Sequence, residues 1–524
     1  MGWTILLLVV GGLMALVIHD VTQRKHAVLH NFPIIGHFRY WLEAIGPELR
    51  QYIVTSNDEE RPFSRDQRRW VYASSKNENN YFGFGSDDDF ERPHNRLLIK
   101  HAVFPYVPPP VMPTPSSADV AAGVKYPIPV AKVLGGSRGR AQAFRPPSIL
   151  NVSAMSFGSL SAPAIEAINR GCRLAGCLHN TGEGGISPYH DNGGELIWQI
   201  GTGYFGCRDE RGDFSLDRFL ENVQRHPVRA IEIKLSQGAK PGVGGIVPGA
   251  KVTPEVAAIR GVPVGQDCIS PPRHSAFHDA DSMLDFVERL ADASGLPVGI
   301  KSAVGEAGFW TDLARLMADG KRGVDFITVD GGDGGTGAAP LVFADHVSLP
   351  FRVAIVRVYR TFVEHGLHER VVFIGSGRLG FPETALLAMA LGCDMVNVGR
   401  TAMLSIGCIQ AQRCHTGHCP TGVATQNRWL MRGLDPTLKS ARLANYVTTL
   451  RKEMLQLSHA CGHCHPALVT LDAFDIMQEA MRSVPAREMV GYEAGWGLPA
   501  PEDRRQIEKI MRGEVDGVPS PAKC

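Results

Sequence analysis

The stretch VVFIGSGRLGFPETALLAMALGCDMVNVGRTAM, residues 371–403, joins a short apolar run to a glycine-rich turn, a helical segment and a second apolar run. Its β-branched runs at 371–374 and 395–398 predict strands. Between them, apolar residues recur at three- and four-residue spacings over 381–392, which predicts a helix. A strand, a helix and a second strand in this order form the unit from which parallel sheets are built.

The same alternation begins at about residue 148, and further helices are predicted at 161–176, 278–295 and 309–320. Eight strands alternating with helices over about 280 residues favour an α/β fold of the (β/α)8 barrel type over an open doubly wound sheet. The predicted strands are residues 149–153, 177–180, 231–235, 262–266, 298–301, 326–329, 371–374 and 395–398.

The last two strand ends carry the composition of a phosphate site, reading FIGSGRLG at 373–380 and VNVGRTAM at 396–403. In such barrels the chemistry lies at the C-terminal ends of the strands, and the loops after strands seven and eight frequently bind phosphate. Glycine lets backbone N–H groups approach an anion, and a following helix N-terminus adds a favourable dipole. The candidate phosphate cradle is Gly375, Ser376, Gly377, Gly399 and Arg400.

The fifth and sixth predicted strands end in residues suited to a flat, electron-rich ring. The sixth ends in VDGGDGGTGAAP at 329–340, a loop with almost no side chains that includes Gly334, Gly335 and Thr336. The fifth delivers Lys301, whose positive charge can stabilise anionic charge on a ring such as a reduced flavin. The alternative is that Lys301 pairs with a carboxylate inside the barrel.

Three cysteines follow the eighth strand in GCIQAQRCHTGHCPTGVATQ, with the spacing C-x5-C-x4-C. Cys408, Cys414 and Cys419 suit an iron–sulfur cluster better than zinc, and three thiolates hold three irons. Zinc requires a fourth ligand, for which His415 or His418 could serve. Isolated cysteines in apolar segments, such as Cys172, Cys268 and Cys393, are expected in the core.

A second cysteine pair, Cys461 and Cys464 followed by His465, satisfies the c-type haem attachment pattern C-x-x-C-H. Haem attachment is not expected in the cytoplasm, where we place this chain. A chance match or an adventitious metal site is therefore the preferred interpretation.

The composition indicates a large soluble core, and the near-zero net charge provides no overall electrostatic attraction for a charged partner. The chain has 524 residues, 44% of them hydrophobic, and a formal net charge of +1. A disordered, fibrous or polytopic membrane protein is excluded, and no nucleic-acid partner is expected. The 57 glycines indicate many tight loops or backbone that approaches a ligand.

The N-terminus contains an uncharged apolar run, WTILLLVVGGLMALVI, from Trp3 to Ile18. A cleavable signal peptide would carry basic residues before this run, so an uncleaved single-pass membrane anchor is the preferred prediction. Arg24, Lys25 and Arg39 all follow the run, and the positive-inside rule then places the catalytic domain in the cytoplasm. The alternative is a partly buried N-terminal helix.

These patterns predict four segments: a membrane anchor at 1–25, a polar and proline-rich extension at 26–145, the barrel at 146–430 and a helical extension at 431–524. Within the first extension, FPYVPPPVMPTPSS begins a proline-dense strap over 104–129 that cannot be helical. Within the last, SARLANYVTTLRKEMLQLSHACG (440–462) and FDIMQEAMRS (474–483) are predicted as amphipathic helices.

Several motifs in one order resemble the synthase domain of glutamate synthase over about residues 145–430. They are SAMSFGSLS at 153–161, HNTGEGG at 179–185, IKLSQGAKPGVGG at 233–245, the glycine loop at 329–340 and the cysteine segment ending CPTGVATQ. The resemblance implies an aldolase-type barrel, FMN, and a [3Fe-4S] cluster on Cys408, Cys414 and Cys419.

The resemblance also implies roles for individual residues. Ser153, Ala154, Met155 and Ser156 would line the flavin, and Lys301 would lie beside its ring. Glu183, Gln237 and Lys240 match positions that hold 2-oxoglutarate or 2-iminoglutarate, and a lysine ammonium suits a dicarboxylate. Arg273 and His274 are further candidates for the pocket.

The sequence departs from the family in ways that affect the expected reaction. Val243 and Ile246 replace a glutamate and a glutamine, which puts the identity of the keto acid in question. The chain shows neither a glutaminase domain nor a nucleotide fingerprint. Ammonia is therefore expected from solution, another subunit or another amine, and electrons from a partner such as ferredoxin or a reductase subunit.

The leading hypothesis is a membrane-anchored FMN and iron–sulfur oxidoreductase that reductively aminates 2-oxoglutarate to L-glutamate. The alternative keeps both cofactors but oxidises an amino acid or amine and passes the electrons to a membrane carrier. A third hypothesis, a scaffold with decayed cofactor sites, is disfavoured because the glycine loops and the three cysteines are intact.

Overall fold

The computed structural model of the chain describes residues 2–88, 95–108, 125–479 and 482–514. The chain divides into two compact units, Met1–Trp70 and Val71–Cys524. The point of division lies within helix α4 (Arg65–Lys76). The predicted boundaries at residues 25, 145 and 430 stay predictions.

The first unit contains helices α1 (Gly2–Thr22), α2 (Ala27–Asn31), α3 (Ile35–Leu49) and the π-helical turn η1 (Arg50–Val54). Helix α1 includes the apolar run Trp3–Ile18 of the predicted anchor and has 21 residues, a length of about 31 Å at 1.5 Å per residue. Within the described residues it is the one helix long and apolar enough to cross a membrane. Its length and composition suit a membrane anchor or a signal sequence.

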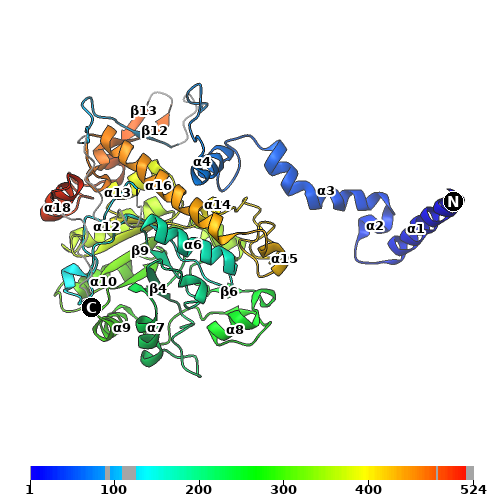
Figure 1. The fold of residues 1–524 in the computed structure, drawn as a ribbon, viewed down its shortest axis with the longest axis horizontal. Helices are drawn as coiled ribbons and strands as arrows, with labels where there is room; N and C mark the ends of the chain where they lie inside the picture. Colours follow the sequence, from blue (N-terminus) through cyan, green and yellow to red (C-terminus); the bar gives the residue numbers. More distant parts are fainter. Residues whose placement is uncertain (1, 89–94, 109–124, 480–481, 515–524) are drawn as a thin grey trace. The chain divides into compact units, whose positions relative to one another are not determined.

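The second unit is built on a closed barrel of eight parallel strands, which confirms the predicted fold (Figure 1). Each strand pairs in parallel with the strand before it in the barrel order, and the last pairs with the first. The strands are β2 (Leu150–Val152), β3 (His179–Asn180), β4 (Leu196–Ile200), β5 (Val228–Lys234), β8 (Val298–Ser302), β9 (Phe326–Asp330), β10 (Val372–Ser376) and β11 (Met395–Val398).

One of the eight predicted strands is wrong. Residues 262–266 form turns rather than a strand, because Pro263 interrupts the run and Gly265 adopts a φ of +74°. The missing barrel strand is instead β4, whose five residues are all buried and pair with β5. One strand was wrongly predicted and one was missed before β8, so Lys301 still lies on the fifth strand of the barrel.

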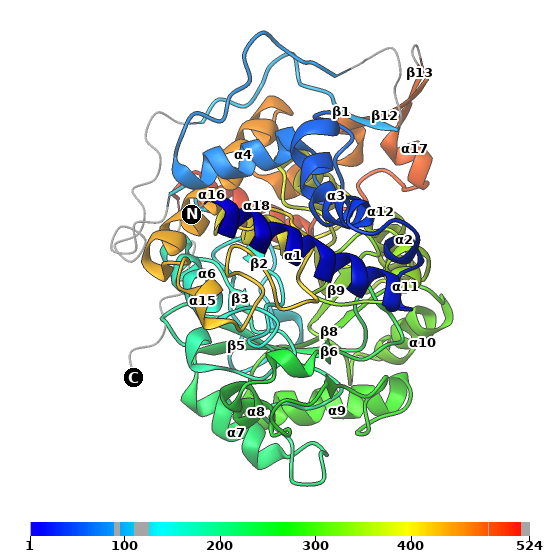
Figure 2. The same cartoon turned by 90° about the vertical axis from the view of Figure 1, so that its right-hand side faces the viewer.

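Helices enclose the strands on the outside of the barrel (Figure 2). The predicted helices after residues 161, 278, 309 and 381 are confirmed. The helices of the barrel region are α6 (Ala162–Ala175), α7 (Leu216–Arg225), α8 (Pro254–Arg260), α9 (Ala280–Ser294), α10 (Gly308–Met317), α11 (Leu341–His346), α12 (Phe351–Glu364), α13 (Pro382–Ala390), α14 (Arg400–Ser405) and α15 (Arg428–Met431).

A long helix beyond the barrel, α16 (Pro436–Ala460), packs along α6 (Figure 1). Gly171 permits this contact, because a Cβ atom there would lie 2.7 Å from Leu443 Cδ2. Arg451, fully buried on α16, donates hydrogen bonds to the carbonyls of Ala175 (2.6 Å) and Gly176 (3.2 Å) at the end of α6. This helix confirms one of the two predicted C-terminal helices.

The other predicted C-terminal helix, at 474–483, is wrong. Residues Phe474–Glu479 form strand β12, which pairs antiparallel with β1 (Arg96–Ile99) and β13 (Arg482–Pro485). The neighbouring strands supply the backbone hydrogen bonds that a helix would have made internally. Helices α17 (Ala486–Val490) and α18 (Pro501–Met511) follow, and residues 109–124 of the predicted proline strap lie outside the described part of the chain.

Candidate active site

The barrel brings every predicted catalytic and flavin-site residue to one end, because parallel strands place all their C-terminal ends at the same mouth. The residues follow or end the strands in chain order: Ser153, Ala154, Met155 and Ser156 after β2, Glu183 after β3, Gln237 and Lys240 after β5, Lys301 in β8, Gly334, Gly335 and Thr336 after β9, Gly375, Ser376 and Gly377 at β10, and Gly399 and Arg400 after β11.

The loop after β2 is held against its two neighbouring strands. The backbone N–H of Ser153 donates to Val398 O (2.9 Å), and that of Met155 donates to Asn180 O (3.0 Å). A Cβ atom on Gly399 would lie 3.6 Å from both Ser153 Cβ and Met155 Cε. The predicted flavin-lining loop and the predicted phosphate glycine are therefore adjacent.

His190 contacts the backbone of this loop at Met155 and was not predicted from the sequence. Its Nδ1 accepts hydrogen bonds from the Ser187 N–H (3.1 Å) and hydroxyl (2.8 Å), and its Nε2 lies 2.9 Å from Met155 O. Burial lowers the pKa of His190 to about 4, so the ring is neutral and donates from Nε2 to the Met155 carbonyl. The capping box Ser187–His190 in SPYH was the available sequence signal.

Lys301 pairs with Asp330, as the alternative interpretation of this lysine expected. The two groups are 3.5 Å apart, and each residue is only 4% exposed. Burial opposes the charge on Lys301, but Asp330 and then Glu232 outweigh it and raise its pKa. Asp330 also accepts from the Gly238 N–H (2.9 Å), which connects Lys301 to the loop after β5. A role for Lys301 beside a flavin ring stays a prediction.

A second carboxylate, Glu232 on β5, crosslinks the barrel interior. It is fully buried and accepts hydrogen bonds from Asn180 (2.7 Å), Gln199 (2.6 Å) and Thr328 (2.6 Å). These partners come from three other strands, β3, β4 and β9. Its charge is therefore balanced by hydrogen bonds that rigidify the floor of the mouth.

Glu183 lies within a group of cations. Its Oε1 is 2.8 Å from Lys234 Nζ, at the end of β5, and the pair is almost buried. Burial raises the pKa of Glu183, but Lys234, Lys240 and Arg260 together lower it below its ordinary value. Lys234 and Arg260 were not predicted. Lys234 could have been suspected because it lies within the quoted motif IKLSQGAKPGVGG, whereas Arg260 lies in none of the quoted motifs and carried no such signal.

Lys240 is 4% exposed, and among the described residues no carboxylate lies within ion-pair distance of its ammonium. Burial and then the charge of Lys234 lower its pKa to about 8, which Glu183 only partly offsets. The mouth thus contains more positive than negative charge around Glu183. An incoming carboxylate would balance it.

Val243 and Ile246, the two positions where the sequence departs from the family, lie in a segment that passes directly over Glu183. A Cβ atom on Gly245 would collide with the Glu183 carboxylate, and one on Gly244 would collide with Ser270 O. The Gly245 carbonyl accepts from the Ser270 N–H (2.9 Å). Val243 and Ile246 flank this crossing, so the change from polar to apolar residues lies at the edge of the charged group.

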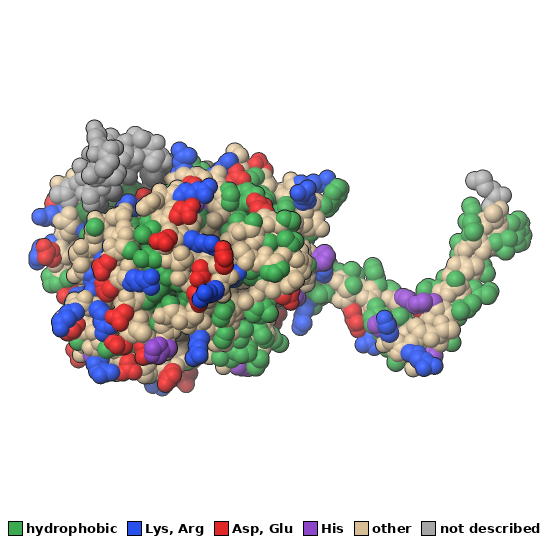
Figure 3. Space-filling model, turned by 90° about the horizontal axis from the view of Figure 1, so that it is seen from below, with side chains coloured by type: hydrophobic (Ala, Val, Ile, Leu, Met, Phe, Trp, Pro, Cys, Tyr) green, Lys and Arg blue, Asp and Glu red, His purple; other side chains and the backbone are tan. Residues whose placement is uncertain are grey.

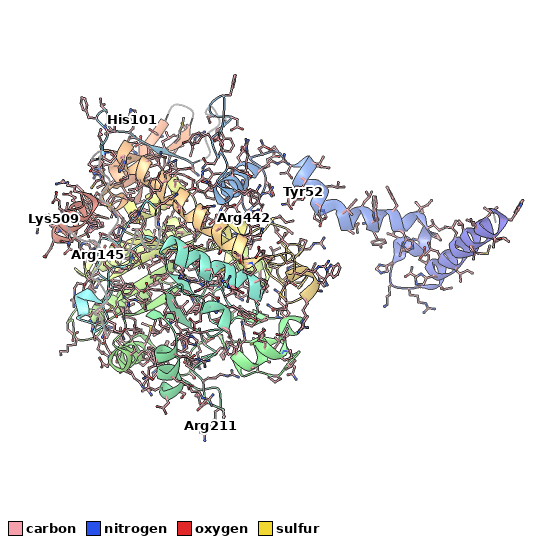
Figure 4. The ribbon with its side chains drawn as sticks, in the orientation of Figure 1. Tyr52, His101, Arg145, Arg211, Arg442 and Lys509 are labelled. Atoms are coloured by element: carbon pink, nitrogen blue, oxygen red, sulfur yellow. The ribbon has the colours of Figure 1, made fainter. Side chains whose placement is uncertain are left out.

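Arg273 and His274 line a cavity of about 650 Å³ beside this group. His274 is neutral, since burial lowers its pKa to about 4, and its Nε2 lies 3.0 Å from Lys234 O. Its Nδ1 lies 3.0 Å from the Tyr204 hydroxyl. Figure 4 labels Arg211, another lining residue, on the loop between β4 and α7. The cavity's rim is therefore basic.

At the other side of the mouth, Arg400 lies against the glycine loop after β9. It donates to Asp333 O, and a Cβ atom on Gly335 would lie 2.5 Å from Arg400 Cδ. Gln237 donates to Gly335 O (2.9 Å). Burial, and then the charge of the nearby Arg378, lower the pKa of Arg400 to about 10. Arg378 was missed, although it stands within the quoted FIGSGRLG motif.

The three cysteines predicted to bind iron lie on one loop after α14. Cys419 is buried, while Cys408 and Cys414 are partly exposed. Burial alone would raise the pKa of the Cys419 thiol. The pKa is instead lowered, because the sulfur accepts hydrogen bonds from the N–H groups of Ala424, Thr421 and Val423 and from the Thr421 hydroxyl. Throughout the described ranges, however, no three Cys, His, Asp or Glu side chains converge closely enough to hold a metal ion.

Lys251, in the turn η4 (Gly249–Lys251), reaches into this loop and was not predicted. It is 3% exposed and donates to Cys414 O (2.7 Å) and Ser159 O (3.2 Å). Burial lowers its pKa, while the nearby thiols of Cys414 and Cys419 act in the opposite direction. A buried cation beside two thiols suits a loop that carries anionic sulfur.

The C-x-x-C-H motif has a structural role. His465 is buried, its Nε2 lies 2.9 Å from Pro129 O, and its Nδ1 accepts from the Ala467 N–H (3.0 Å). Cys464 is buried, and the partly exposed Cys461 thiol contacts Lys100 O. Both ring nitrogens of the histidine are engaged, which leaves none to ligate haem iron. The isolated Cys172, Cys268 and Cys393 are buried, as predicted.

A closed (β/α)8 barrel with two lysine–carboxylate ion pairs and glycine-rich loops at one mouth is the architecture of a barrel enzyme. The family model described as the conserved region in glutamate synthase matches residues 141–464. The chain therefore belongs to the glutamate synthase family, and it is an oxidoreductase of the glutamate synthase type that acts on CH–NH2 donors.

Individual relatives support this assignment to the glutamate synthase family. The glutamate synthase large subunit-like protein YerD of Bacillus subtilis is 40% identical over 468 residues, which cover 85% of this chain and 89% of YerD. The archaeal glutamate synthase [NADPH] of Methanocaldococcus jannaschii is 36% identical over 317 residues, which cover 59% of this chain and 58% of the relative. The chain thus matches little more than half of the archaeal protein.

Similar solved structures include the flavin-binding domain of baker's yeast flavocytochrome b2, at 15% identity and a TM-score of 0.43, covering 82% of this chain and 84% of that domain. Mandelate oxidase with (S)-4-hydroxymandelic acid has 16% identity and a TM-score of 0.40, covering 71% of this chain and 85% of that chain.

Proposed function

We propose that this chain reductively aminates 2-oxoglutarate to L-glutamate at the barrel mouth, using FMN and electrons from ferredoxin or a reductase subunit. The observation that carries the proposal is the charge balance around Glu183. One carboxylate faces Lys234, Lys240 and Arg260, and the 4% exposed Lys240 has no ion-pair partner of its own among the described residues. A dicarboxylate supplies the missing negative charge.

The residues around the opposite side of the mouth fit FMN. Arg400 and Arg378 bring two positive charges together next to Gly377 and Gly399, which suits a phosphate. The loop from Ser153 to Ser156 would face the ring, together with Lys301. When bound, reduced FMN supplies a hydride to an imine carbon.

The protein's own groups would bind and orient the substrate. Lys240 and Lys234 would pair with its carboxylates, and the Glu183 carboxylate would hold the ammonium or imine nitrogen by hydrogen bonding. Gln237, fixed to the glycine loop through Gly335, would contact the substrate between the two sides of the mouth. Ammonia would come from solution, another subunit or another amine.

We further propose a [3Fe-4S] cluster on Cys408, Cys414 and Cys419 as the entry point for electrons. The N–H groups around Cys419 and the buried Lys251 support anionic sulfur at this loop. The three thiols would have to converge when iron binds, because they do not form a metal site in the described structure.

Helix α1 is proposed to anchor the protein as a single membrane pass, with the barrel in the cytoplasm. The basic residues Arg24, Lys25 and Arg39 on its C-terminal side support this orientation. Anchoring gives weight to a second candidate function, in which the enzyme oxidises an amino acid or amine and reduces a membrane carrier. The apolar Val243 and Ile246 beside Glu183 also favour a less polar substrate than 2-oxoglutarate.

The test is an anaerobic visible spectrum of the purified chain before and after reduction with dithionite, with any excess reductant removed. Addition of 2-oxoglutarate and ammonia should restore the oxidised flavin band, whereas either compound alone should not. If the flavin stays reduced, other keto acids are tested. Bleaching of the oxidised enzyme by an amine or amino acid in the reverse assay would instead support the dehydrogenase.

A further inference from the structure

Helix α3 carries an apolar stripe that no other described residue of the first unit covers. Ile35, Phe38, Leu42 and Leu49 are all exposed, with Ile35 at 76% and Phe38 at 60%. At about 100° per residue, these positions lie on one face of the helix. Apolar residues on a soluble surface are normally scattered, so a stripe of this length indicates a surface that contacts something.

The stripe continues beyond the end of α3. Tyr52, Ile53 and Val54 in the turn η1 are exposed, the last two by 73% and 75%. Figure 4 labels Tyr52 where the chain leaves α3, and Figure 3 shows apolar side chains along this unit's surface. The apolar surface thus extends from residue 35 to residue 54.

Side-chain contacts fix the start of α3 at the C-terminal end of α1. Asp20, fully buried on α1, accepts from the Ile34 N–H (3.1 Å) and lies 2.9 Å from His37 Nε2. Helix α1 is about 31 Å long, close to the roughly 30 Å hydrocarbon thickness of a bilayer. If α1 spans the bilayer, α3 therefore begins at the membrane surface.

The composition of α3 suits that position. Trp41, which is 54% exposed, stacks on Phe38 with ring centroids 5.7 Å apart, and aromatic rings of this kind concentrate at membrane interfaces. Arg24 and Lys25 are exposed just before α2, where they can reach anionic headgroups.

We propose that α3 and η1 lie in the membrane interface, with the stripe from Ile35 to Val54 buried against lipid. The proposal rests on the membrane insertion of α1 and adds a second contact that orients the chain as it leaves the bilayer. A lipid surface is the occupant because Asp20 holds the start of the stripe beside the C-terminal end of the apolar helix α1, and an aromatic ring and basic residues border it.

The test uses the full chain in liposomes whose lipids carry bromine at a shallow or a deep acyl position. Bromine quenches tryptophan fluorescence at contact, and the contribution of each tryptophan is obtained by comparison with its Trp→Phe variant. Trp41 should be quenched, more by the shallow than by the deep label. Trp429, which is 66% exposed on α15 in the second unit, is the control and should not be quenched.

Trp3 in α1 separates the two proposals. Quenching of Trp3 without quenching of Trp41 would overturn the interfacial role of α3, whereas no quenching of either would show that α1 itself is not inserted and would overturn both proposals. Leu42→Asp, on the stripe, should reduce Trp41 quenching at least twofold. Ala44→Asp, on the opposite face of α3 and also exposed to solvent, should leave it unchanged.

Discussion

Lys234 Nζ lies 2.8 Å from Oε1 of Glu183, and this pair joins strand β5 to the loop after β3 at the barrel mouth. Both side chains are nearly buried, with 10% and 14% exposed. Two groups separated by about fifty residues in the chain thus form the charged centre around which the proposed substrate site is arranged.

Breaking this pair on one side should destabilise the protein. Glu183→Gln leaves the Lys234 ammonium buried without its partner, and we expect a loss of about 3 kcal/mol in the free energy of unfolding. The double variant Glu183→Gln with Lys234→Met should cost less than the sum of the two single changes. Denaturant unfolding measures all three, and additive losses would contradict an energetic coupling.

The affinity for 2-oxoglutarate should fall as the pH rises through about 8. Lys240 binds a carboxylate only when protonated, and its pKa of about 8 is below that of an ordinary lysine. The charged form is complete well below this value and is lost above it, so Kd should rise roughly tenfold between pH 7 and pH 9. Lys240→Arg should remove this dependence, which isothermal titration would measure. An unchanged slope in the arginine variant would assign the titration to another group.

Loss of the Arg400 charge should weaken retention of FMN. Arg400→Leu removes one of two guanidinium groups beside the proposed phosphate cradle, and a charge-assisted contact of this kind contributes about 1.5–3 kcal/mol. We therefore expect Kd for FMN to rise by at least tenfold in a fluorescence titration of the apoprotein. Arg357→Leu, an exposed change on α12, is the control and should bind FMN normally.

Removal of the Lys251 cation should lower the reduction potential of the proposed cluster. Reduction adds negative charge to the cluster, and a buried ammonium beside Cys414 and Cys419 stabilises that charge. Lys251→Met should retain iron but titrate at a lower midpoint potential by electron paramagnetic resonance. Lys321→Met, whose side chain is 83% exposed, should leave the potential unchanged. An absence of iron from the unaltered protein would refute the cluster itself.

Restoring the polar residues of the family should change the preference among keto acids. Val243→Glu with Ile246→Gln places polar groups beside the crossing over Glu183, where a specific contact can change selectivity by orders of magnitude. The double variant should lower KM for 2-oxoglutarate relative to keto acids with an apolar side chain, without altering FMN content. Equal KM changes for all keto acids would indicate that these positions do not select the substrate.

Much of the candidate site could be predicted from the sequence, because its residues stand at the ends of recognisable strands. The β-branched runs and the glycine loops after them are local patterns, and a parallel barrel necessarily gathers such ends at one mouth. The pairing partner of Lys301 could not be identified this way. Asp330 lies on the next strand, and only the register of β8 and β9 brings the two side chains together.

By itself, the sequence determined the barrel, seven of its eight strands in outline, and the candidate mouth and cysteine loop, because local periodicity and glycine placement set the type of each element. The tertiary structure decided which short runs become strands. Leu196–Ile200 forms one because β5 supplies hydrogen bonds, and Phe474–Glu479 does so because β1 and β13 pair with it. It also decided which charges meet. Lys234, Arg260 and Lys251 acquire their roles from burial beside distant partners, and neither burial nor distance is encoded in a local pattern.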